Sequence, residues 1–356
     1  MNRRKLAFQK GLTTLRGTKA PLLARTPGRI CALGPSLYNA AHMLQPNQVV
    51  KGDCIELLNA GQEGTIDLVF ADPPFNIGYL YHGYNDKRND KDYCAFSKDW
   101  MAAVHRALKP NGSFYLAIGD EYAADLCVIA RRELGFNLRN WIIWHYTFGQ
   151  QTKRMFAKSH THILYFTKDE KEFTFNPDAV RVASARQTTY ADSRANPKGK
   201  LPDDTWYLRP QETPAEFFAP DSDTWNVSRV CGTFKEREGW HGCQMPIGVL
   251  NRIIQASSNP GDIVLDPFNG SGTTVVAAAL LDRRYVGIDQ SEEYVSYARK
   301  RLQHALEMKE KSAGPMAAAA IDIRAIADPT RASKVMTGTD AFGRPRVTRR
   351  RAAKTA

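Results

Sequence analysis

Short apolar runs alternate with helix-like stretches through the middle of the chain. Residues 66–71 are almost entirely apolar, as in a strand that is buried in a parallel sheet. Residues 93–108 instead carry hydrophobic side chains at helical spacing. Because strands and helices alternate, we predict an α/β fold with a doubly wound, mostly parallel sheet. The other predicted strands cover 113–118, 141–146, 162–167, 261–265 and 284–289, and the other predicted helices cover 55–59, 123–134, 247–256 and 275–281.

The periodic pattern is absent from three parts of the chain. Residues 1–47 have few regularly spaced apolar positions, which is typical of a flexible arm. Residues 171–239 are rich in Arg, Lys, Trp, Tyr and Pro, and residues 306–356 form an alanine-rich and then basic tail. We therefore predict one domain in two halves, 48–170 and 240–305, with an insertion between them and flexible ends.

Composition narrows the class of protein. The chain has 356 residues and 43% hydrophobic content, which is enough for one large or two small domains with a real core. No apolar run approaches the ~18 residues that a membrane-spanning helix needs. The six cysteines lack C-x-x-C spacing, which favours a reducing compartment and argues against a zinc cluster. We therefore expect a cytoplasmic protein without a metal site.

The net charge of +12 is concentrated at the two ends of the chain. Residues 1–52 contain nine Lys or Arg and no Asp or Glu, and residues 343–356 contain six and none. Since these basic residues outnumber the net charge, the stretch between them is slightly acidic. A near-neutral core with basic ends suits a protein that binds a polyanion such as DNA.

The first candidate site follows the strand at 66–71. There the chain reads Asp72-Pro73-Pro74-Phe75, and the prolines end the strand. Ligands of open α/β sheets bind beyond the carboxyl ends of the strands, where this tetrapeptide is expected to lie. The Asp72 carboxylate and the Pro73 carbonyl offer two acceptors and Phe75 offers a flat face, a set that fits a planar heterocycle with an amino group.

A second strand, turn and helix follow near the other end of the domain. The turn reads Asp266-Pro267-Phe268-Asn269-Gly270-Ser271-Gly272-Thr273-Thr274, and the strand after the helix ends in Asp289. Glycines allow a close backbone approach to a ligand, and the helix offers free N–H groups. An acid such as Asp289 is placed as the ribose-binding acid of nucleotide folds is. The motifs G-x-G-x-x-G and G-x-x-x-x-G-K-[ST] are both absent, so we expect neither a dinucleotide fingerprint nor a P-loop.

These two motifs, in this order, resemble those of the amino-directed DNA methyltransferases that use S-adenosylmethionine. The order Asp-Pro-Pro-Phe first and Asp-Pro-Phe-x-Gly-Ser-Gly-Thr-Thr second is similar to the permuted, β-type members, and the resemblance covers about 49–302. It implies a Rossmann-like methyltransferase sheet, with Asp72, Pro73, Pro74 and Phe75 as the catalytic residues. It also implies a cofactor site made of Asp53, Cys54, Gln244, Asp266, Phe268, Gly270, Gly272, Thr273, Thr274 and Asp289.

The same resemblance implies how duplex DNA is held. Residues 76–92 are expected to form a mobile loop over the target base. Residues 147–156 and 159–162 resemble the wall around the flipped base, although His145 and Thr161 replace the Lys and Glu that relatives often have. The insertion at 171–239 corresponds to the target-recognition region. His241 is expected to be structural, and Gly343-Arg344-Pro345-Arg346 resembles an AT-hook core, which suits an A·T-rich minor groove.

The sequence identifies the methylated base and the binding partners less narrowly than it identifies the family. A tetrapeptide that begins with Asp looks like that of the adenine-N6 enzymes, so we expect N6-methyladenine in double-stranded DNA. Cytosine-N4 methylation is the nearest alternative, and an RNA methyltransferase or a nucleic-acid-binding protein on the same fold is a further one. The family also suggests a homodimer, a cognate restriction endonuclease and a location at the nucleoid. Cytosine-C5 chemistry is not favoured, because Cys243 follows Gly242 and not Pro.

Overall fold

The computed structural model describes most of the predicted core and little of the ends. The chain divides into Met1–Asn39 and Ala40–Ala356, and every described residue belongs to the second unit. The predicted arm, His241, most of the insertion and most of the tail therefore lie outside the described residues. Those described are 44–81, 84–150, 153–182, 184, 186, 190, 192–206, 244–311, 336–339 and 345–347.

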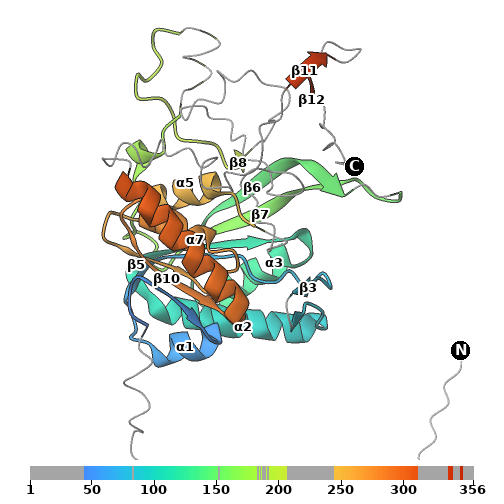
Figure 1. Cartoon of the computed structure of the whole chain (residues 1–356), viewed down its shortest axis with the longest axis vertical. Coiled ribbons are helices and arrows are strands. Elements are labelled where there is room, and N and C mark those ends of the chain that lie inside the picture. The colour runs from blue at the N-terminus through green and yellow to red at the C-terminus, as the bar shows by residue number, and fades with distance from the viewer. Residues whose placement is uncertain are drawn as a thin grey trace, which may run out of the picture. The chain divides into compact units, whose positions relative to one another are not determined.

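An eight-stranded sheet forms the centre of the domain (Figure 1). Its neighbouring strands are parallel except at two pairings, β5 with β7 and β7 with β6. The prediction of a mostly parallel sheet is thus confirmed. In spatial order the strands are β1 (Gln48–Lys51), β10 (Arg284–Asp289), β9 (Ile263–Asp266), β2 (Ile66–Ala71), β5 (Leu108–Ile118), β7 (Lys158–Thr167), β6 (Asn137–Gln150) and β8 (Thr205–Trp206).

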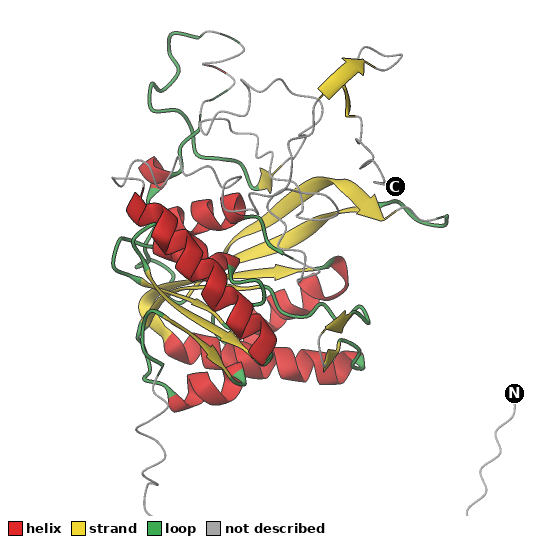
Figure 2. Ribbon diagram, in the orientation of Figure 1, coloured by secondary structure: helices red, strands yellow, loops and turns green. Residues whose placement is uncertain are grey.

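Helices cover both faces of this sheet, so it is doubly wound as predicted (Figure 2). Successive side chains of β2 point to opposite faces. Phe70 packs in one apolar cluster with α5, α6 and α7, and Val69 packs in the other with α1, α2 and α3. The helices are α1 (Cys54–Ala60), α2 (Asp90–Ala107), α3 (Asp120–Val128), α5 (Ile247–Ser257), α6 (Thr273–Leu280) and α7 (Glu292–Lys311).

Three elements differ from the prediction in their extent. β5 begins at Leu108, because residues 109–112 form an irregular extension of the strand where its register with β2 shifts. The helix expected over 123–134 is α3 followed by a π-helical turn, Ile129–Glu133. Helix α7 continues to Lys311, beyond the predicted start of the tail at 306.

Residues 76–92 are more regular than expected. The described part contains a short antiparallel pair, β3 (Leu80–Tyr81) with β4 (Tyr84–Asn85), and it ends in the first turn of α2. A short hairpin of this kind is compatible with the expected loop, whose mobility and position over the target base stay predictions.

The start of the predicted insertion packs against the core. The backbone N–H of Asn176 donates to the Ala256 carbonyl at the end of α5, and a short 3-10 turn follows at Pro177–Ala179. Strand β8, near the end of the described part of the insertion, extends the sheet beside β6.

Strands β11 (Met336–Thr339) and β12 (Pro345–Val347) form a separate antiparallel pair. Because β12 includes Pro345 and Arg346, the AT-hook-like segment is extended there, and its contact with DNA stays a prediction. None of the helices in the described part of the chain combines the length and the apolarity that a bilayer crossing requires.

Candidate active site

The tetrapeptide Asp72-Pro73-Pro74-Phe75 lies at the carboxyl end of β2. The strand is buried along its whole length, Pro73 is buried, and Asp72 and Phe75 are half-buried. The hydroxyl of Tyr93 on α2 donates to the Pro74 carbonyl at 2.7 Å. Phe75 lies against Gly119, where a Cβ atom would come within 3.2 Å of the ring. The core therefore holds this tetrapeptide from two sides while Asp72 reaches the surface.

A hydrogen-bonded turn fixes the chain just after Phe75. Asn76 has a φ of 60°, a conformation that Asn tolerates better than most residues. Its backbone N–H donates to the buried Asp86 carboxylate at 2.8 Å, and its side chain donates to the Tyr122 hydroxyl at 2.7 Å. The Tyr122 hydroxyl in turn donates to Asp90 at 2.9 Å. Sequence reasoning missed these residues, although an Asn directly after the tetrapeptide was a visible signal of a tight turn.

The second motif is organised around the buried carboxylate of Asp266, the last residue of β9. One oxygen accepts from the backbone N–H of Phe268 at 3.0 Å, and the other accepts from the Thr274 hydroxyl. Burial raises the pKa of Asp266 to about 7, although these two hydrogen bonds act in the opposite direction. Asp266 therefore shapes the turn from inside and does not present its oxygens to solvent.

Both the backbone conformation and the close packing of this turn require a glycine at position 272. Gly272 has a φ of 75°, and a Cβ atom there would lie 2.8 Å from the Cβ of Ala298 on α7. No side chain in the described part of the protein caps the helix α6 that follows, so its first N–H groups can bind a ligand. The Thr273 hydroxyl accepts from Arg301 at 2.8 Å. Since both Thr273 and Thr274 use their hydroxyls inside the loop, a ligand would meet their backbone amides.

The pairing of β1 with β10 brings the other predicted cofactor residues together. Asp289, at the end of β10, accepts from the N–H groups of Gly270 and Ser291, both at 2.8 Å, and burial raises its pKa. Asp53 caps α1 through the Ile55 N–H at 2.8 Å, and its second oxygen accepts from Gln290, beside Asp289, at 2.8 Å. Thus Asp53, Asp289 and the glycine-rich turn share one edge, as the permuted order predicts.

Cys54 and Gln244 are less accessible than the acids. The Cys54 side chain is buried, and this burial raises the pKa of its thiol to about 12, so it is neither a thiolate nor a nucleophile. Gln244 is buried shortly before α5. The role of Gln244 stays a prediction.

The two motifs meet because β2 and β9 are neighbours. Val69 pairs with Leu265, so the residues that follow the two strands emerge side by side. On one side of this pairing the sheet continues through β10 and β1, and on the other through β5. Such a point, where the strand order reverses, is where open α/β sheets bind their ligands. The geometry supports a shared site for a nucleotide-like ligand and a flat heterocycle.

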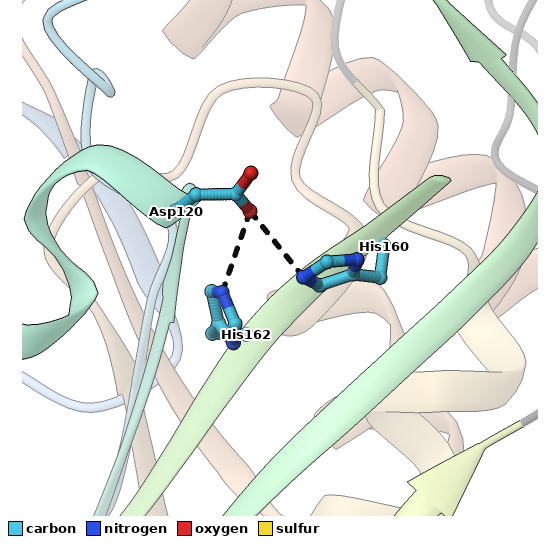
Figure 3. A group of neighbouring side chains, drawn as sticks. All are labelled: Asp120, His160 and His162. Carbon is cyan, nitrogen blue, oxygen red and sulfur yellow. Dashed lines mark ion pairs between the residues drawn. The ribbon is translucent and has the colours of Figure 1, made fainter. Parts of the chain in front are cut away.

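A polar cluster of Asp120, His160 and His162 lies next to this edge (Figure 3). The Nε2 atoms of both histidines are 3.4 Å from one Asp120 oxygen. Trp141 donates its Nε1–H to His162 Nδ1 at 2.8 Å, and an indole N–H can only donate. The proton of neutral His162 must therefore be on Nε2, where it faces Asp120. Burial is the main cause that lowers the pKa of His162. Because the one lone pair of this neutral ring, on Nδ1, already accepts from Trp141, the cluster fits a hydrogen-bonded wall and not a metal site.

Comparisons with known proteins agree with this geometry. The family model described as DNA methylase matches residues 66–300. Type II methyltransferase M.HpaI from Haemophilus parainfluenzae is 36% identical over 255 residues, which cover 72% of this chain and 74% of that protein. DNA adenine methyltransferase YhdJ from Escherichia coli (strain K12) is 34% identical over 260 residues, which cover 72% and 83%.

A solved structure, the PvuII DNA methyltransferase (cytosine-N4-specific), is similar in fold. Its TM-score is 0.52 at 19% identity, and the match covers 76% of this chain and 93% of that one. The family model extends over most of the chain, and relatives above 30% identity align over most of their own length. On this evidence, the chain belongs to the N6/N4 DNA methylase family.

Proposed function

We propose that this DNA methyltransferase transfers a methyl group from S-adenosylmethionine to the N6 amino group of adenine in double-stranded DNA. The observation that carries the proposal is the position of Asp72-Pro73-Pro74-Phe75 at the end of β2, beside the glycine-rich turn after β9. A relative at 34% identity is named a DNA adenine methyltransferase, which favours adenine over cytosine.

The glycine-rich turn before α6, together with the nearby acids Asp53 and Asp289, fits S-adenosylmethionine. The uncapped start of α6 leaves backbone N–H groups for a ligand, and the αL conformation of Gly272 shapes the turn in front of them. The carboxylates of Asp289 and Asp53 are acceptors for the hydroxyl and amino groups of a nucleoside. When bound, S-adenosylmethionine supplies a methyl group on a positively charged sulfur, so transfer to an amine needs no metal and no covalent enzyme intermediate.

The catalytic tetrapeptide would act mainly by positioning. The target adenine must leave the duplex stack to reach it, at an unstacking cost of a few kcal/mol. Phe75 then stacks on the base, and Asp72 and the Pro73 carbonyl accept the two N–H groups of its amino nitrogen. These bonds concentrate electron density on that nitrogen and align it for attack, and alignment of this kind can supply much of an enzyme's acceleration.

Several finer expectations accompany this proposal. The family suggests a homodimer, a cognate restriction endonuclease for the same site and a location at the nucleoid. The basic ends of the chain fit additional contacts with DNA phosphates.

The deciding experiment is mass spectrometry of nucleosides from duplex DNA treated with the protein and isotope-labelled S-adenosylmethionine. We expect label in N6-methyladenine, and the modified positions would then give the recognition sequence. Label in N4-methylcytosine would keep the mechanism and correct the base. Label in RNA alone, or no label at all, would contradict the proposal.

A further inference from the structure

The ribbon formed by β6 and β7 extends beyond the catalytic edge of the sheet. Strand β6 runs in the same direction as β2 and β5, because both β6 and β5 are antiparallel to β7. The end of β6 therefore points to the same side as Asp72 and Phe75. The last residue of β5, Ile118, pairs with His162, whereas β7 begins four residues earlier, at Lys158. Figure 1 shows this ribbon projecting past the end of β5. At about 3.3 Å per residue, the four residues correspond to an overhang of about 13 Å.

The tip of this ribbon carries exposed apolar and basic side chains together. Phe156 is 98% exposed and is the most exposed large hydrophobic residue in the described part of the chain. Met155 beside it is 63% exposed, and Lys153 and Arg154, which precede it, are exposed as well. The segment 150–158 contains three basic residues and no acidic one. Single exposed apolar residues are common on proteins, but an adjacent pair at the end of a projecting ribbon is not explained by the fold.

We infer that Phe156, supported by Met155, is a wedge that enters the DNA stack at the place from which the target base is extruded. The inference rests on the proposed function and adds a partner surface to it. Proteins that kink or open a duplex often insert Phe, Leu or Met between bases, because a bulky apolar side chain fills the gap between the unstacked bases. The cations of Lys153 and Arg154 are placed to neutralise neighbouring phosphates.

The charge of the tip favours DNA over a second copy of this chain as its binding partner. The segment 150–158 is basic and has no acidic residue, so a polyanion is attracted to the tip, whereas the tips of two copies repel each other. Lys158, at the base of the tip, pairs with Asp120 at 3.5 Å, on the edge of the sheet that is next to Phe75. This ion pair connects the tip to the candidate active site.

The test compares Phe156→Ala, Phe156→Leu and the control Val128→Ala, which alters an exposed apolar residue on α3. Each is assayed on two duplexes that carry the site mapped from methylated plasmid DNA. In one duplex the target adenine is paired, and in the other it lies opposite an abasic position and is already loosened. Thermal unfolding and the KM for S-adenosylmethionine are measured for every variant.

We expect Phe156→Ala to reduce kcat/KM on the paired duplex by about tenfold or more, the size of one lost stacking contact. On the abasic duplex its rate should be within about twofold of wild type, because little stacking remains to be replaced. Phe156→Leu should keep most of the activity, and Val128→Ala all of it. An unchanged rate on the paired duplex, or an equal loss on both duplexes, overturns the inference.

A separate binding experiment covers the case in which the wild-type protein methylates no DNA, so that the proposed function itself fails. Fluorescence anisotropy on a labelled generic duplex then measures affinity against salt. The double variant Lys153→Ala/Arg154→Ala should reduce the salt slope by about 1 to 2, and Phe156→Ala should weaken binding. Unchanged binding in these variants, or conversion of a dimer to a monomer by Phe156→Ala, contradicts the assignment of the tip to DNA.

Discussion

Asp72 and Asp266 end two neighbouring strands, but their surroundings give them different tasks. Asp72 is half-buried and lies at the open edge, whereas Asp266 is buried and holds the turn before α6. We predict that Asp72→Ala lowers the rate of methyl transfer by at least ~100-fold, since an acceptor that orients the amino group is lost. The dissociation constant for S-adenosylmethionine, measured by calorimetry, should change little. A large loss of cofactor affinity in this variant would show that Asp72 also contributes to binding S-adenosylmethionine, contrary to this assignment.

The environment of Asp266 predicts a pH effect with a definite sign. Its pKa rises from 3.8 to about 7 on folding, so between these values the folded state holds a proton that the unfolded state has released. This contribution to stability is present at low pH and is lost as the pH rises through 7. Between about pH 5 and about pH 8, the wild type should lose roughly 3 kcal/mol relative to Asp266→Asn. Chemical unfolding of both proteins at the two pH values measures this, and parallel pH profiles would refute it.

At the scale of the element, the glycine-rich turn depends on close packing against α7. Gly272→Ala combines a positive φ with a contact of 2.8 Å to Ala298, so it should lower the free energy of unfolding by roughly 2 to 4 kcal/mol. Gly135→Ala is the matched control, because Gly135 has a φ of 79° and nothing within 4 Å of the added methyl group. It should cost only about 1 kcal/mol. The double variant Gly272→Ala/Ala298→Gly should recover part of the stability, and equal losses in the two single variants would exclude the clash as the cause.

The elements also show what the pattern of residues can and cannot predict. Strands β2 and β10 are predicted correctly because short apolar runs bounded by turns reflect burial, which is a local property of the chain. The anchoring of Asn76 by Asp86 and Tyr122 was missed because hydrogen bonds between distant residues leave no period. β6 is longer than its apolar core suggests, because pairing with β7 extends it through polar residues. The candidate site was predictable to the extent that its residues follow predicted strands.

For the whole molecule, the uneven charge predicts how the chain engages DNA. Residues 1–43 contain eight Lys or Arg and no acidic residue. Their deletion should weaken binding to generic duplex DNA and reduce the slope of log affinity against log salt by about 1 or more, depending on how many of them contact phosphates. The rate at saturating DNA should stay the same, since the tetrapeptide Asp72-Pro73-Pro74-Phe75, the candidate catalytic segment, is unchanged. Anisotropy titrations at several salt concentrations test this, with a deletion of 343–356 for comparison, and an unchanged slope would mean that the arm does not touch DNA.

The pairing of β1 with β10 has a consequence for synthesis of the chain. β1 leaves the ribosome early, but its hydrogen-bonding partner is encoded more than two hundred residues later. Contacts between such distant segments are slow to form, and an unpaired strand edge favours aggregation until its partner strand has been synthesised. A polypeptide that stops before Arg284 contains Asp72 and its neighbours but lacks the partner strand of β1 and the acid Asp289. The candidate site can therefore be complete only late in translation, when β10 and β9 enter the sheet between β1 and β2.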